Sequence, residues 1–173
     1  DEVEELVRRL REVLEEIREL VERVNDRNRR VLEENRELVT RSIEELRRAL
    51  ERIERLSKDV RREEIRKILE ELEKRSRDIN RESEELLRRL AKENKEILDR
   101  IKKILDDLRE EAKRKTRDEK LKKVLEEVER RAKKLLRDIE ESLRRVAREV
   151  ERSNEENKKV TKEVADAVRE IER

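Results

Sequence analysis

The chain has 173 residues, of which 59% are charged and 32% hydrophobic, and its 52 basic and 50 acidic residues leave a formal net charge of +2. It contains no Gly, Pro, Cys, His, Met or aromatic residue. These absences exclude disulfides, thiol chemistry and the usual transition-metal ligands, and the interleaved charges without aromatics argue against nucleic-acid binding.

Three amphipathic helices are predicted in chain order, because hydrophobic side chains recur every three or four residues. The first stripe runs from Val3 to Leu56, the second from Ile65 to Leu108 and the third from Leu121 to Ile171. Each stripe uses about three positions per heptad, which is the width of a core-facing helix in a bundle. We therefore expect helices over residues 2–56, 60–114 and 118–172, each about 55 residues long.

Two short connections separate the stripes. The hydrophobic rhythm lapses at Ser57-Lys58-Asp59 and at Thr116-Arg117-Asp118, and Ser, Thr and Asp are residues that cap helix N-termini. Thr116 with Glu119 also fits a capping box. Short connections make successive helices antiparallel, and the stripes repeat close to the 3.6 residues per turn of a straight helix. The expected fold is all-α: a single domain, 1–173, folded as an up-down-up antiparallel three-helix bundle of nearly straight helices.

Asn, Ser and Thr residues interrupt the apolar stripes at core-facing positions. If they are buried, each must find a partner, because an unpaired buried polar group costs roughly 1–3 kcal/mol. The alternative is that these residues lie at the edge of the core and face water. The candidate buried polar residues, beside which Thr40 also falls, are Asn25, Asn28, Asn35, Ser42, Ser76, Asn80, Ser83, Asn94, Ser142, Ser153, Asn154, Asn157 and Thr161.

Most of these residues fall at matching heights on the three predicted helices, which favours buried polar layers over scattered surface positions. The heights follow from a first connection centred near residue 58. We expect such layers to specify the register of the bundle, since a misregistered bundle would leave them unpaired. The three predicted sets are Asn35 with Asn80, Ser153 and Asn154; Ser42 with Ser76, Asn157 and Thr161; and Asn25 with Asn94 and Ser142.

The sequence predicts no catalytic, cofactor-binding or metal site. Its Asp and Glu residues lie on polar helix faces, where solvated ion pairs are their usual role. Its Ser and Thr residues lack a general base such as His, and there is no Gly-rich loop to hold phosphate. No apolar run approaches the roughly 20 residues that span a bilayer, and the start shows no signal-peptide pattern. We expect a soluble, non-enzymatic chain of unknown location that binds no nucleic acid, membrane or small-molecule substrate.

The composition and patterning together resemble de novo designed helical bundles, of the kind built on parametric backbones with buried hydrogen-bond networks. Only eleven residue types are used, with Val/Ile/Leu stripes, Glu/Arg/Lys surfaces and polar layers around Asn35, Asn80 and Ser153. Connections without Gly or Pro depart from many such designs. The resemblance implies a structural scaffold without an active site, a cofactor or a required partner.

Other functions stay open beside the scaffold. An interaction module would present a groove to be completed by another helix, as a subunit of a designed heterodimer or a homo-oligomer. Ile43 and Ala91, which lie beside the main stripes, are the candidates to line such a groove. A natural solvent-bridging coiled coil is a third reading, although natural coiled coils rarely avoid Gln, Met and His together.

Overall fold

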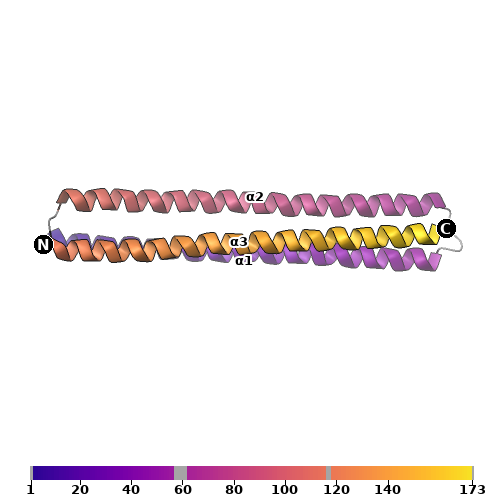
Figure 1. Cartoon of the computed structure of the whole chain (residues 1–173), viewed down its shortest axis with the longest axis horizontal. Helices are drawn as coiled ribbons and strands as arrows, with labels where there is room; N and C mark the ends of the chain where they lie inside the picture. Colours follow the sequence, from indigo (N-terminus) through magenta and orange to yellow (C-terminus); the bar gives the residue numbers. More distant parts are fainter. Residues whose placement is uncertain (1, 57–61, 116–117, 173) are drawn as a thin grey trace. The chain divides into compact units, whose positions relative to one another are not determined.

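The chain is all-α and folds as a three-helix bundle. A computed structural model describes residues 2–56, 62–115 and 118–172, which form α1 (Glu2–Leu56), α2 (Arg62–Lys115) and α3 (Glu119–Glu172) (Figure 1). The predicted fold class is confirmed, and the helix boundaries agree with the prediction to within two residues. The expected first residues of the second helix, 60 and 61, and the expected capping residues Ser57, Asp59 and Thr116 lie outside the described residues.

Local sequence explains how α3 begins. The carboxylate Oδ1 of Asp118 accepts a hydrogen bond from the backbone N–H of Lys120 at 3.0 Å, and its carbonyl oxygen accepts one from the N–H of Lys122 at 3.3 Å. Asp118 is therefore the N-cap of the helix, so α3 starts at Glu119, one residue later than predicted. Acidic residues in the first turn of each helix, such as Glu2, Glu63 and Glu119, favour the positive end of the helix dipole.

The helices contribute to two compact units, and each unit contains one segment of every helix. Unit 1 comprises Asp1–Arg29 and Arg89–Arg145, and unit 2 comprises Arg30–Arg88 and Val146–Arg173. That residues 1–173 form a single domain stays a prediction.

The contacts within each unit give the helix directions. In unit 1, Arg9 pairs with Glu111 and Arg27 with Glu93, so α2 runs antiparallel to α1. In unit 2, Arg36 pairs with Glu149 and Ser42 bonds to Asn157, so α3 runs parallel to α1. The order of helices is therefore up, down, up.

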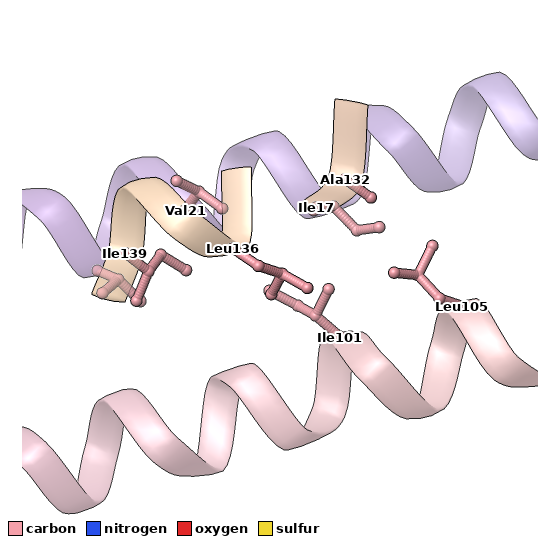
Figure 2. Close-up of a cluster of buried hydrophobic side chains, with 8 residues drawn as sticks. Ile17, Val21, Ile101, Leu105, Ala132, Leu136 and Ile139 are labelled. Carbon is pink, nitrogen blue, oxygen red and sulfur yellow. The ribbon is translucent and has the colours of Figure 1, made fainter. Parts of the chain in front are cut away.

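Aliphatic side chains from all three helices form the core of unit 1. Figure 2 shows Ile17 and Val21 of α1, Ile101 and Leu105 of α2, and Ala132, Leu136 and Ile139 of α3 gathered between the ribbons. Ile17, Ile101 and Ile139 are 0% exposed, and full burial of such a side chain is worth roughly 1.5–3 kcal/mol. A second cluster in this unit consists of Leu6, Leu10, Leu14, Leu121 and Val128.

One cluster of buried apolar side chains lies in unit 2. It begins at Leu46 of α1 and Leu72 of α2, and elsewhere in the unit several core positions carry Asn or Ser instead. These polar positions are the feature of the chain that most needs a physical explanation. The apolar cluster consists of Leu46, Ile53, Ile65, Leu72, Val160, Val164 and Val168.

Candidate functional site: buried polar layers

Where side-chain burial is described, at residues 2–55, 62–114 and 118–171, nine polar side chains are buried, each no more than 7% exposed. All nine are Asn or Ser, and no charged side chain in these ranges is buried. A buried polar group must be paired, because it gives up its hydrogen bonds to water. The nine are Asn28, Asn35, Ser42, Ser76, Asn80, Ser83, Asn94, Asn154 and Asn157.

In unit 1, the Asn28 layer joins Asn28 of α1, Asn94 of α2 and Ser142 of α3. The two amides exchange hydrogen bonds: Asn28 Nδ2 donates to Asn94 Oδ1 at 3.2 Å, and Asn94 Nδ2 donates to Asn28 Oδ1 at 3.0 Å. Asn28 Nδ2 also donates to Ser142 Oγ at 3.1 Å, and Asn94 Nδ2 to the Leu90 carbonyl oxygen at 2.8 Å. Each amide thus has a partner for its oxygen and two acceptors for its Nδ2.

In unit 2, the Asn157 layer is centred on Asn157 of α3, which is 0% exposed. Its Oδ1 accepts from Ser42 Oγ of α1 at 2.8 Å, and its Nδ2 donates to Asn80 Oδ1 and to Ser76 Oγ of α2, each at 3.0 Å. Ser76 Oγ lies 2.7 Å from Thr161 Oγ1, which donates to the Asn157 carbonyl oxygen at 2.7 Å. This layer also ties all three helices together.

The Asn35 layer of unit 2 is only partly paired. The Ser83 hydroxyl of α2 donates a hydrogen bond to Asn35 Oδ1 of α1. Within the described part of the chain, Asn35 Nδ2 has no hydrogen-bond partner, and neither do the buried Oδ1 atoms of Asn154 and Asn25. The Asn35 layer thus differs from the Asn28 and Asn157 layers, because some of its buried polar atoms have no hydrogen-bond partner.

The α2 partner of Asn35 differs from the prediction because the first connection is centred later than expected. α1 ends at Leu56 and α2 begins at Arg62, so the midpoint is residue 59 and the level of Asn35 on α2 moves from residue 81 to residue 83. Asn35 therefore meets Ser83, and Asn80 belongs to the Asn157 layer instead.

Four of the thirteen candidate residues, and Thr40 beside them, are not among the nine buried side chains. Asn28 takes the place expected for Asn25 against Asn94 and Ser142, and Asn25 is half-buried beside it. Ser153 is half-buried and has no hydrogen bond to Asn35 or Asn80 within the described residues. Ser142 and Thr161 are half-buried but bonded, and Thr40 is exposed.

Interhelical ion pairs lie around these layers, on the surface. In unit 1, Arg109 Nε of α2 donates to Glu129 Oε1 of α3 at 2.6 Å. This hydrogen bond and the negative charge of Glu129 raise the pKa of the Arg109 guanidinium above its ordinary value. The Arg109 side chain is 39% exposed, so solvent screens the pair and its contribution to stability is below about 1 kcal/mol.

A groove of about 930 Å³ lies between α1 and α2 of unit 2. Its lining combines charged side chains with four apolar ones, Ala49 and Ile53 of α1 and Ile68 and Leu72 of α2. Ile68 is 38% exposed and is the only large hydrophobic residue exposed among those that the structure describes. Ile43 and Ala91, expected beside such a groove, are half-buried and do not line it.

The described helices contain neither a metal-binding cluster nor a membrane-spanning segment. Residues 2–56, 62–115 and 118–172 contain no group of three or more His, Cys, Asp or Glu side chains arranged to hold a metal ion. Within these residues, no helix contains an apolar stretch long enough to span a bilayer.

Comparison with known proteins agrees with the sequence resemblance. No protein-family model matches the chain, and no curated protein is similar to it. Among solved structures, a computationally designed three-helix bundle is similar, with a TM-score of 0.62 and 19% sequence identity over 98% of this chain and 88% of that one. The chain thus shares its fold with a designed three-helix bundle.

Proposed function

We propose that this chain is a designed structural scaffold without a natural biochemical activity, in which buried polar layers specify the helix register. The observation that carries the proposal is that the Asn28 layer and the Asn157 layer each tie all three helices. The eleven-residue alphabet and the likeness to a designed three-helix bundle support it.

The physical basis is the difference between polar and aliphatic core positions when a helix slips. The aliphatic clusters are built from Leu, Ile and Val, which can pack against one another in several registers. A slip of one heptad would separate Asn28 from Asn94 and leave both amides buried without partners. Each unpaired group would cost about 1–3 kcal/mol. The polar layers therefore make a shifted register less stable than the native register by an amount that the aliphatic residues alone do not provide.

The test removes one whole layer. A variant with Asn28→Leu, Asn94→Leu and Ser142→Ala replaces every side chain of the Asn28 layer with an apolar one. We expect its denaturation midpoint to equal or exceed that of the parent, because no polar group is left unpaired. We also expect its ¹⁵N–¹H spectrum to show more than one peak for residues of unit 1.

A matched control carries three exposed substitutions, Arg30→Lys, Lys92→Arg and Glu141→Asp, and should keep both the parent midpoint and single peaks. A single set of peaks for the layer variant would contradict the proposed role of the polar layer. A marked loss of stability in that variant would contradict it as well.

A second candidate function, an interaction module completed by another chain, has one observation in its favour. The groove between α1 and α2 is lined in part by apolar side chains, and one of these, Ile68, is exposed. Light scattering coupled to size exclusion at several concentrations separates the two functions. A constant mass near 21.3 kDa supports the self-contained scaffold. A mass of two or more chains that Ile68→Lys returns to one chain supports the module.

A further inference from the structure

Among the described residues, two complementary polar atoms of unit 2 are buried without hydrogen-bond partners. Asn35 on α1 is 1% exposed, and its Nδ2 is a donor without an acceptor; Asn154 on α3 is 6% exposed, and its Oδ1 is an acceptor without a donor. Buried polar groups in folded proteins are nearly always paired with protein or with ordered water. We therefore expect Asn35 Nδ2 and Asn154 Oδ1 to share one hydrogen-bond partner.

The register of α2 against α3 places Asn154 level with Ser83, the hydrogen-bond partner of Asn35. Ser76 contacts Thr161, and four residues further along α2, Asn80 contacts Asn157, four residues back along α3. One more turn in the same register brings Ser83 level with Asn154. Ser83 in turn is hydrogen-bonded to Asn35. The Asn35 layer therefore has one side chain from each helix: Asn35, Ser83 and Asn154.

The offset of α1 against α3 favours a bridge over a direct hydrogen bond. The bond from Ser42 to Asn157 puts Asn154 opposite residue 39 of α1, about one turn from Asn35. Four residues correspond to about 6 Å along the helix axis, so Asn35 and Asn154 extend toward the core from different levels. Two hydrogen bonds that meet at one water oxygen join atoms about 4.5–5 Å apart, against about 3 Å for a direct hydrogen bond, so a water molecule can join side chains that are offset in this way.

We propose that one water molecule is bound inside unit 2 and joins Asn35 to Asn154. The water oxygen accepts from Asn35 Nδ2, and one water hydrogen is donated to Asn154 Oδ1. The second hydrogen is donated to Ser83 Oγ, whose own hydrogen already goes to Asn35 Oδ1. Three hydrogen bonds are the usual number for a buried water. With this ligand, the Asn35 layer ties all three helices, as the Asn28 and Asn157 layers do.

The water site goes beyond the scaffold function and does not depend on it. Failure to find the water would leave the Asn28 and Asn157 layers, and their proposed role in register, unchanged. Conversely, a bundle whose register proved insensitive to those layers could still hold the water.

The test is water–amide cross-relaxation measured by NMR on the side-chain NH₂ groups. The Asn35 protons should show a NOESY cross-peak to water with the sign of the diagonal and a ROESY cross-peak of opposite sign, a combination that a long-lived bound water gives and proton exchange does not. The control is Asn94 in the same sample, whose Nδ2 is bonded to Asn28 Oδ1 and to the Leu90 carbonyl oxygen and should show no such peak. In Asn154→Leu, the Asn35 peak should disappear, while the Asn28 and Asn94 shifts report that unit 1 is still folded.

No water peak at Asn35 in the parent, or an unchanged peak in Asn154→Leu, would overturn the proposal. A crystal structure of the parent provides a second test that needs no variant. It should show a density peak within hydrogen-bond distance of both Asn35 Nδ2 and Asn154 Oδ1. A direct hydrogen bond between the two side chains would exclude the water.

Discussion

Replacing Asn157 with Ala should destabilise the bundle more than any other single polar substitution. Asn157 is fully buried and pairs with Ser42 on α1 and with Ser76 and Asn80 on α2. In Asn157→Ala, the Ser42 hydroxyl and Asn80 Oδ1 lose their partner on α3, whereas Ser76 keeps Thr161. At about 1–3 kcal/mol for each unpaired buried group, the expected loss in the free energy of unfolding is about 2–6 kcal/mol.

The same layer made apolar as a whole should behave differently. The combined variant Asn157→Leu, Asn80→Leu, Ser42→Ala and Ser76→Ala leaves no partner of Asn157 on α1 or α2 unpaired. Its free energy of unfolding should equal or exceed that of the parent, because a polar network replaced in full by apolar groups is often neutral or stabilising. The single substitution should therefore cost more than the fourfold one.

Guanidinium chloride denaturation, followed by far-UV circular dichroism, measures both effects. Thr40→Ala is the control, since Thr40 is exposed on the same helix as Ser42, and it should change the free energy of unfolding by less than about 0.5 kcal/mol. The reasoning is refuted if Asn157→Ala matches this control. It is also refuted if the combined variant is less stable than Asn157→Ala.

Three further predictions follow from the packing, the cap and the ion pair. Ile139→Ala, at a position that is 0% exposed, should lower the free energy of unfolding by about 2–5 kcal/mol, against about 0.5–1.5 kcal/mol for Ile139→Val; equal losses in denaturation would contradict close packing there. Asp118→Ala should cost about 0.5–2 kcal/mol and speed amide exchange at Lys120, whereas Asp118→Ser should restore protection; unchanged exchange would argue against the cap. Glu129→Gln should cost less than about 1 kcal/mol, and the loss should shrink in high salt. Because Glu129 raises the pKa of Arg109 above its ordinary value, the stabilisation is present below that ordinary value and lost only as the pH rises through the raised one; a salt-independent loss would contradict an ion pair.

The helices could be predicted from the sequence because their signal is local. The first stripe ends at Leu56, and α1 ends there too. The spacing of apolar residues depends on the helix period alone, so each stripe could be interpreted without knowledge of the other two. Short connections then left the up-down-up order as the simple solution.

The partners within each layer could not be predicted with the same accuracy, because they depend on the relative heights of three helices. An error of one residue in the centre of the first connection moved the α2 level of Asn35 by two residues, so that Ser83 and not Asn80 is its partner. Asn25 and Asn28 are three residues apart and share one helix face, so periodicity does not choose between them. Their exact packing decides that Asn28 meets Asn94.

The most direct test of the central claim, that polar layers specify register, is a distance measurement within unit 2. Because the chain contains no Cys, spin labels can be attached at Thr40→Cys on α1 and Asp78→Cys on α2, both exposed positions. Electron–electron dipolar spectroscopy on the labelled parent should give one narrow distance distribution. The fully apolar Asn157 layer should add a second distance, because a slip of one heptad moves a helix by about 10 Å. A single, unchanged distance in the apolar variant would contradict the account.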